Sequence, residues 1–252
     1  MNLVIDVGNT SVKVGLFEKR NLLFVGEFAS HPIKEVDEWG VLLSNWIKQF
    51  EGKVEIRKVI ISSVASSVSA PLKKAIKKYL KLSSFEVTPK KVKIPLLYDD
   101  PGQIGADRIA NAVALTELYK LPAIAVDFGT ATTFDVVSEK GEYLGGVIAP
   151  GVRSSLKSLS KETEKLWVVE FKRPTRVIGN TTRDNLISGV FYSSLGAVKE
   201  IIREIKEELG KEATVVATGG LGALVGKECE EIDEVNSSLT LQGLNFIGEK
   251  WA

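Results

Sequence analysis

The stretch LVIDVGNTSVKV, residues 3–14, decides the fold, because its pattern returns as IAVDFGTATTFDV at residues 124–136. Each stretch is an apolar strand that ends in Asp-x-Gly, followed by small hydroxyl-bearing residues and an alternating second strand. A Glu-Lys turn then follows each aspartate at the same offset, at residues 18–19 after Asp6 and at residues 139–140 after Asp127. Internal similarity of this length predicts two lobes built on one plan.

The segments around these two stretches extend the duplication. A third strand is expected after each, at residues 22–28 and 143–148, and amphipathic helices are predicted at 35–50, 70–80, 106–119 and 183–209. Pro122 follows the predicted helix 106–119 and precedes the second set of strands, so it marks the join between the lobes. We therefore expect an N-terminal lobe at 1–119 and a C-terminal lobe at 120–252.

Composition excludes several classes of function. The chain has 252 residues, a formal net charge of +1, one cysteine and one histidine, so a disulfide framework, a multi-cysteine zinc site and a Ser-His-Asp triad are disfavoured. The balanced charge gives no reason to expect a nucleic acid or an anionic membrane as partner. No apolar run approaches the length of a membrane span, and no basic leader precedes the first strand, which favours a cytoplasmic protein.

The Asp-x-Gly hairpins suit phosphate chemistry. Glycine allows a tight turn, and the backbone N–H groups and hydroxyls beside it can face a phosphate chain. An aspartate at the strand end needs a cation between itself and phosphate, so Asp6 and Asp127 are interpreted as ion-side residues of one shared cleft. The alternative is that each aspartate only caps its own turn. Lys13, on the outgoing strand, could reach a phosphate or could be an ordinary polar-face residue.

Gly219 and Gly220 follow an apolar strand at 213–217 and precede a predicted helix. Such a helix start suits an anion or the close approach of a flat purine. A plain glycine-rich strand-to-helix turn remains the alternative. A P-loop is excluded, because Glu228 stands where that motif requires Ser or Thr after Gly-Lys.

The segment DPGQIGADRIAN, residues 100–111, combines a glycine-punctuated loop with a helix start. Asp107 in the first helical turn is explained by the helix dipole alone, but Arg108 beside it adds nothing to capping. Together they suit a hydroxy-acid substrate, with Arg108 binding a carboxylate and Asp107 accepting the proton of the attacking hydroxyl. At residues 179–182, before the long helix, the sequence GNTT is explained as an N-cap.

Taken in order, these motifs resemble those of the type III pantothenate kinases, within the acetate/sugar kinase–Hsp70–actin superfamily. The matching segments are DVGNTSVK at 6–13, GADR at 105–108, DFGTATT at 127–133 continuing into GGVIAPG at 145–151, and, more weakly, Thr181-Thr182. The resemblance covers essentially the whole chain. It implies an α/β fold of two ribonuclease H-like, actin-like lobes, each a mixed five-stranded sheet flanked by helices, with a cleft between the lobes.

The resemblance also implies residue roles. The ATP-binding set would be Asp6, Val7, Gly8, Asn9, Thr10, Ser11, Val12, Lys13, Gly129, Thr130, Gly219 and Gly220, with Asp6 on the Mg²⁺ side. The substrate set would be Tyr98, Gly105, Ala106, Asp107, Arg108 and Thr182, with Asp107 as general base. Asp127 would coordinate a monovalent cation, K⁺ or NH₄⁺. A homodimer is implied, and the reaction would convert ATP and pantothenate to ADP and 4′-phosphopantothenate, the first step of coenzyme A biosynthesis.

Three alternatives remain at this point. Another small-molecule kinase of the superfamily would share the cleft but would not need residues 105–108. A non-catalytic, transcription-accessory member of the family would show no turnover. An ATP-driven machine of the Hsp70 or actin kind would need a peptide-binding domain or filament insertions, for which the chain is short.

Overall fold

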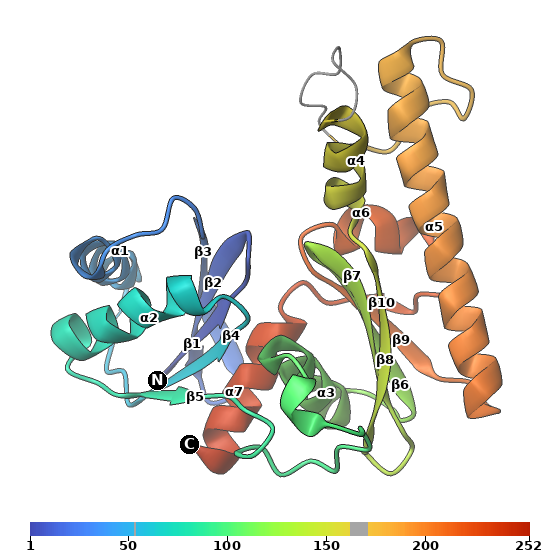
Figure 1. Ribbon diagram of the computed structural model, residues 1–252. Helices are drawn as coiled ribbons and strands as arrows, with labels where there is room; N and C mark the ends of the chain where they lie inside the picture. Colours follow the sequence, from blue (N-terminus) through green and yellow to red (C-terminus); the bar gives the residue numbers. More distant parts are fainter. Residues whose placement is uncertain (53, 162–170) are drawn as a thin grey trace. The chain divides into compact units, whose positions relative to one another are not determined.

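The computed structural model describes residues 1–52, 54–161 and 171–252 (Figure 1). The chain forms two compact units, one of Met1–Leu118 with Leu239–Ala252 and the other of Tyr119–Ser238. Each unit contains one five-stranded sheet. The predicted α/β class with two duplicated, mixed sheets is therefore confirmed.

The sheet of the first unit has the strand order β3-β2-β1-β4-β5. Its strands are β1 (Asn2–Val7), β2 (Ser11–Glu18), β3 (Asn21–Ala29), β4 (Lys58–Ser63) and β5 (Ser84–Glu86). The hairpin strands β1, β2 and β3 pair antiparallel, whereas β4 runs parallel to both β1 and β5. The Asp-x-Gly turn thus lies at the end of a central strand with a paired neighbour on either side.

Helices cover both faces of this sheet. They are α1 (Val36–Lys48), α2 (Ser66–Ala75) with the following π-helical turn η1 (Ile76–Leu80), the 3₁₀ turn η2 (Pro101–Gln103), α3 (Ala106–Leu118) and α7 (Leu239–Trp251). Side chains that alternate along β1, such as Leu3 and Ile5, form one core with Trp39 of α1 and Leu72 of α2. On the other face α7 packs on β1 and β4, and α3 packs on α7. Successive side chains of β1 point to opposite faces of the sheet, so the strand packs against helices on both faces.

The sheet of the second unit repeats this arrangement, with the order β10-β9-β6-β7-β8. Its strands are β6 (Ala123–Phe128), β7 (Ala131–Val137), β8 (Tyr143–Pro150), β9 (Thr214–Thr218) and β10 (Glu234–Val235). The antiparallel and parallel pairings match those of the first sheet strand for strand. Its helices are α4 (Val152–Lys161), α5 (Thr182–Leu209), α6 (Gly222–Val225) and the 3₁₀ turn η3 (Gly226–Glu228).

The predicted lobe boundary is wrong for the last helix. Residues 239–252 were expected in the C-terminal lobe, but α7 belongs to the first unit. The cause is its apolar face, which includes Leu244 and Ile247 and is buried against β1, β4 and α3. Polar contacts add to this packing, because Asn2 Nδ2 donates to Asn245 Oδ1 at 3.0 Å and Lys58 Nζ donates to the Gly248 carbonyl at 2.9 Å.

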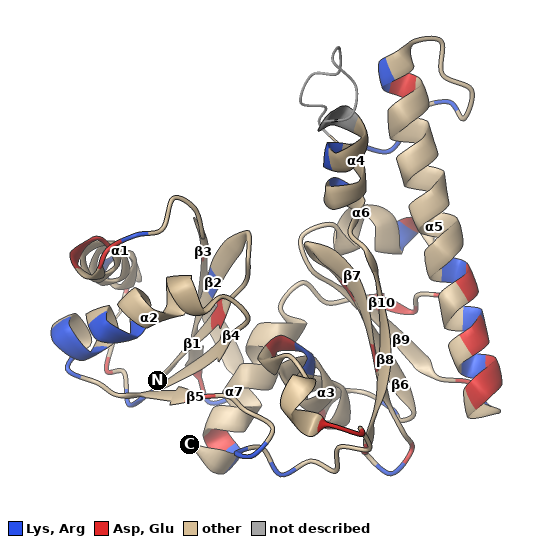
Figure 2. Cartoon of the chain, viewed as in Figure 1, with Lys and Arg blue, Asp and Glu red and all other residues tan. Residues whose placement is uncertain are grey.

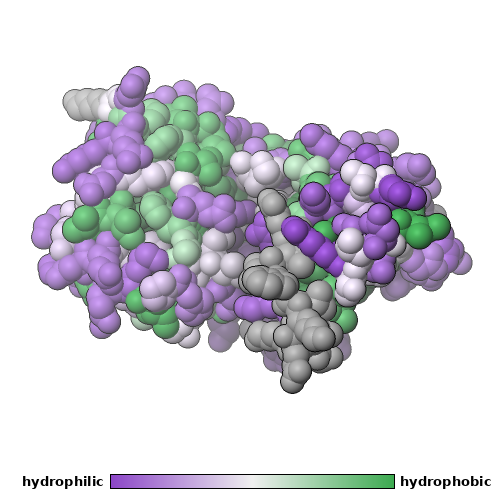
Figure 3. All heavy atoms as spheres, turned by 90° about the horizontal axis from the view of Figure 1, so that it is seen from above, coloured by the Kyte–Doolittle hydropathy of each residue, from purple (hydrophilic) through white to green (hydrophobic). Residues whose placement is uncertain are grey.

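Acidic residues lie at the start of α1, and lysines lie in the last turn of α2 (Figure 2). As predicted, α2 and η1 bury Leu72 and Ile76 and carry lysines outward, of which Lys73 pairs with Glu86 at 3.1 Å. Near its C-terminal end α5 carries residues of both signs. The viewed surface is mainly hydrophilic, with smaller hydrophobic areas in both units (Figure 3). In the part of the chain that is described, no helix is long and apolar enough to cross a membrane.

Candidate active site

Asp6 lies near the end of β1 and is flanked across the sheet by Lys13 on β2 and Ser62 on β4. The Ser62 hydroxyl donates a short hydrogen bond to Asp6 Oδ1. Burial raises the pKa of the Asp6 carboxyl from its ordinary value of 3.8 to about 6, and the charge of Asp107 adds to the rise. The Ser62 hydrogen bond and the Lys13 charge lower the pKa in part. The fold alone, without a ligand, therefore disfavours the ionised form of Asp6.

The turn after Asp6 is held by backbone contacts. Gly8 N donates to the Ser11 carbonyl at 3.0 Å, and a Cβ at Gly8 would approach the same oxygen at 3.1 Å. Ser30, a buried residue just beyond β3, donates its hydroxyl to the Gly8 carbonyl at 2.7 Å and its N–H to the Thr10 carbonyl at 3.0 Å. The tip at Asn9 and Thr10 is exposed. A phosphate could therefore be met by a pre-formed backbone loop.

Two of the predicted ATP-binding residues can act only through their backbone. The side chains of Val7 and Val12 are fully buried in the core between the sheet and α1–α2. Lys13, the next residue, is partly exposed and lies opposite Asp6 in the register. The alternation along β2 thus separates residues that pack from those that can face a ligand.

Asp107 sits in the first turn of α3, which the loop from Asp100 introduces. Asp100 fixes that loop by accepting from Gly102 N and from Gln103 Nε2, both at 3.0 Å. Asp107 Oδ1 accepts from Arg108 N at 2.9 Å and lies so close to Gly105 that a Cβ there would overlap it. Burial raises the pKa of Asp107, opposed by hydrogen bonds from backbone N–H groups and by the Arg108 charge.

The first unit therefore brings Asp6, Asp107 and Lys13 into one electrostatic environment. Arg108, the residue after Asp107, is largely buried, whereas Tyr98 is exposed on the preceding loop. Asp107 raises the pKa of Asp6, and burial raises the pKa of both acids. Two such acids next to a lysine are the arrangement expected where one acid meets a metal and the other meets a proton.

The second unit carries the equivalent hairpin, with one difference in charge. Asp127 on β6 is flanked by Thr133 on β7 and Thr218 on β9, in the same registers as Lys13 and Ser62 around Asp6. A neutral hydroxyl thus replaces the lysine. Ser154 donates to the Thr130 carbonyl at 2.7 Å, as Ser30 does to the Gly8 carbonyl, so a serine beyond the third strand supports each turn.

Gly219 is tied to Asp127 by close packing. Its φ is +84°, and a Cβ at this position would overlap Asp127 Oδ1 and the Phe128 backbone. For Gly220 the described residues place nothing within 4 Å of an added Cβ. The helix predicted after the glycine pair is α6, which spans only Gly222–Val225. So short a helix has little dipole to offer an anion, which favours the close approach of a ligand as the interpretation of the glycine pair.

Thr182 is the predicted substrate residue in the second unit. The N-cap of α5 is Thr181, whose Oγ1 accepts from Asp184 N at 3.1 Å and donates to Asp184 Oδ2 at 2.7 Å. The cap therefore uses Thr181, and Thr182 is the exposed first residue of the helix.

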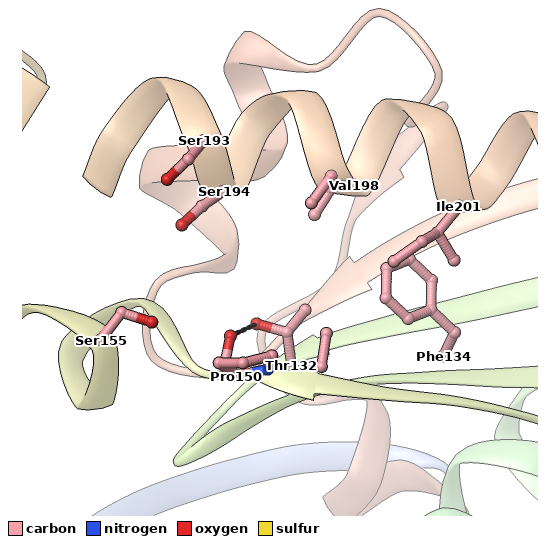
Figure 4. Close-up of a pocket in the computed structure, with 10 residues that line it drawn as sticks. Thr132, Phe134, Pro150, Ser155, Ser193, Ser194, Val198 and Ile201 are labelled. Atoms are coloured by element: carbon pink, nitrogen blue, oxygen red, sulfur yellow. Dashed lines mark hydrogen bonds between the residues drawn. The ribbon is translucent and has the colours of Figure 1, made fainter. Parts of the chain in front are cut away.

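One cavity lies within the second unit, apart from these residues. It has a volume of about 170 Å³ and lies between β7, β8, α4 and α5, with Thr132, Ser155, Ser193 and Ile201 in its wall (Figure 4). None of the described residues assigned above to ATP or substrate lines it. Small side chains on α5 leave this gap above the sheet, which we interpret as a packing feature.

Solved structures give the class to which this fold belongs. A Baf family protein from Campylobacter jejuni aligns over 98% of both chains with a TM-score of 0.62 at 20% identity. A ROK hexokinase from Thermus thermophilus aligns over 97% of both with a TM-score of 0.52 at 11% identity. Such low identities concern the fold alone. With its two Asp-x-Gly hairpins on duplicated sheets, the chain has an actin-like α/β fold.

Sequence comparison then gives the family. The family model described as type III pantothenate kinase matches residues 2–204. A type III pantothenate kinase of Koribacter versatilis (strain Ellin345) is 43% identical over 264 aligned residues, which cover 99% of this chain and 96% of the relative. The chain belongs to the type III pantothenate kinase family. Membership implies ATP, a divalent metal and a small-molecule substrate.

Proposed function

We propose that this chain transfers the γ-phosphoryl group of ATP to the primary hydroxyl of pantothenate, with Asp107 as the general base. The observation that carries the proposal is the placement of Asp107 in the first turn of α3, with one carboxylate oxygen fixed by Arg108 N. A carboxylate held in this orientation can accept the proton of a substrate hydroxyl. The raised pKa makes the carboxylate a stronger base than an ordinary aspartate.

Asp6 is the residue that we assign to the Mg²⁺ side of the nucleotide. Among the described residues no group of three or more His, Cys, Asp or Glu could hold a metal ion. That finding fits Mg²⁺, which is usually bound by one or two carboxylates together with substrate phosphates and water. When bound, Mg²⁺ would neutralise charge on the β- and γ-phosphates. The loop 8–11 and Lys13 supply backbone N–H groups, hydroxyls and a positive charge for the same phosphates.

Asp127 is the residue that we assign to the monovalent cation, K⁺ or NH₄⁺. Its neighbour across the hairpin is Thr133, whereas Asp6 has Lys13 in that position. A carboxylate that approaches phosphate without a lysine beside it needs a mobile cation for charge balance. Gly129, Thr130, Gly219 and Gly220 would complete the nucleotide contacts on this unit.

The pantothenate site would consist of Gly105, Ala106, Asp107 and Arg108, with Tyr98 and Thr182 as further lining. Arg108 suits the substrate carboxylate. We also propose a homodimer. The support is a set of exposed apolar residues on the second unit: Ile148, Leu159, Val177, Ile178 and Tyr192. A cytoplasmic location is proposed because the reaction consumes ATP.

A coupled assay of ADP release tests the function. Pantothenate should support turnover that requires Mg²⁺, and sugars and other hydroxy acids should give far lower rates. Preference for another acceptor would indicate a different small-molecule kinase. No acceptor-dependent turnover at all, under conditions where nucleotide binds, would favour a non-catalytic family member and overturn the proposal.

A further inference from the structure

Ser62 contacts the Asp6 carboxylate through its side-chain hydroxyl. It comes from β4, 56 residues further along the chain, and is fully buried. Its hydroxyl donates to Asp6 Oδ1 rather than to a backbone carbonyl. Neither sequence motifs nor family resemblance assigns a role to this residue.

The strand that carries Ser62 is a rigid support. β4 is paired on both sides, with β1 and with β5, and the three residues before Ser62 are buried apolar side chains. A serine buried in such a strand loses its hydrogen bonds to water, and this costs free energy unless its hydroxyl finds a partner in the protein. Here the partner is a carboxylate, so the hydrogen bond is charge-assisted and directional when Asp6 is ionised.

The geometry points to Ser62 as a positioning residue that fixes Oδ1 of Asp6 and so directs Oδ2 toward the Mg²⁺–nucleotide complex. This inference rests on the proposed role of Asp6. A carboxylate held at one oxygen keeps a single rotamer, and a metal–phosphate complex then meets a ligand that is already oriented.

The second unit supports a link between the hydroxyl and the aspartate. Thr218 on β9 stands opposite Asp127 in the same register as Ser62 opposite Asp6, and it is also buried. The strands are otherwise apolar at their centres, reading VIIS at 59–62 and VVAT at 215–218. After duplication, a hydroxyl residue therefore stands beside each aspartate, although the rest of the two strands differs.

The test compares Ser62→Ala with wild type by calorimetric titration of a non-hydrolysable ATP analogue, in Mg²⁺ and in EDTA. We expect about tenfold weaker binding in Mg²⁺, the effect of losing one charge-assisted hydrogen bond, and a change of less than about twofold in EDTA. Ser69→Ala is the matched control, because Ser69 is also buried in the first unit and its hydroxyl donates to a backbone carbonyl, that of Ser66, at 3.4 Å. It should bind as wild type does in both media.

Two results would overturn the inference: unchanged binding of Ser62→Ala in Mg²⁺, or equal weakening in Mg²⁺ and EDTA, which would indicate a general structural effect. Ser62→Cys keeps the volume with a weaker donor and should fall between wild type and alanine. It decides the question in the same way if the alanine variant does not fold. If Ser62→Ala weakens the binding of Mg²⁺–nucleotide but the wild type does not turn over pantothenate, the proposed function fails while this inference stands.

Discussion

Asp6→Asn should make the protein more stable at neutral pH while abolishing its activity. Asparagine has nearly the same shape as aspartate, and its Oδ1 can still accept the hydrogen bond from Ser62. The substitution therefore removes a charge without removing the contact. The change in the free energy of unfolding then measures how much the ionised carboxylate at the end of β1 destabilises the fold.

The magnitude follows from the pKa of Asp6, which is 3.8 ordinarily and about 6 in the folded chain. Because the folded state binds this proton more tightly, the contribution of Asp6 to the stability is fully present below pH 4 and is lost as the pH rises through 6. At about 1.4 kcal/mol for each pH unit, the loss is about 3 kcal/mol. This value is an upper limit, because Asp6 is partly exposed and the substitution also deprives Lys13 of a negative neighbour.

Urea unfolding between pH 4.5 and 7.5 measures the effect, followed by the fluorescence of Trp39 and Trp46, which are buried in the core of the first unit. The free energy of unfolding of Asp6→Asn should exceed that of wild type by up to about 3 kcal/mol at pH 7.5, and the difference should shrink as the pH falls toward 4.5. Asp99→Asn, at an exposed loop position in the same unit, is the charge-matched control and should show little difference at any pH.

The reasoning is refuted if Asp6→Asn is no more stable than wild type at pH 7.5. It is also refuted if the gain is the same at every pH, because a constant gain cannot come from a titrating carboxylate. Loss of turnover in the stabilised variant would show that the charge at position 6 is retained for function.

Three further outcomes are expected. Asp107→Asn should keep nucleotide binding but reduce kcat by about 10²-fold and flatten the acidic side of the pH–rate profile; turnover close to wild type would remove Asp107 from the base role. Asp127→Ala should weaken the activation of turnover by K⁺ or NH₄⁺, and unchanged activation would contradict the cation assignment. Gly219→Ala should lower the free energy of unfolding of the second unit by more than about 1 kcal/mol, since its φ is +84° and a Cβ would overlap Asp127. Gly220→Ala is its control and should have a smaller effect; equal losses in the two variants would argue against the contact.

Much of the fold could be predicted from the sequence because the same strand–turn–strand pattern occurs twice. The hairpin and third strand of each unit lie where the repeated pattern places them. Strand alternation and the Asp-x-Gly turn are local signals, so they survive without knowledge of tertiary contacts. The two parallel edge strands, β5 and β10, are too short to show any alternation.

What the sequence did not reveal depends on long-range pairing. The placement of α7 in the first unit follows from its packing on β1 and β4, about 180 to 250 residues away in sequence. Ser62 and Ser30 become neighbours of the hairpin only through strand register and chain reversal. One signal could have indicated Ser62 and Thr218: each repeat has an apolar strand that ends in a hydroxyl residue.

The duplication also explains why the two aspartates need not do the same chemistry. Both units supply the same scaffold, an aspartate at a central strand end with a hydroxyl residue on the parallel neighbour. The antiparallel neighbour differs, with Lys13 in the first unit and Thr133 in the second. In the first unit α3 also brings a second acid, Asp107, close enough to raise the pKa of Asp6. On the roles proposed above, one change of charge at an equivalent register and one helix that adds a second acid would be sufficient to make two distinct ion sites from one repeated turn.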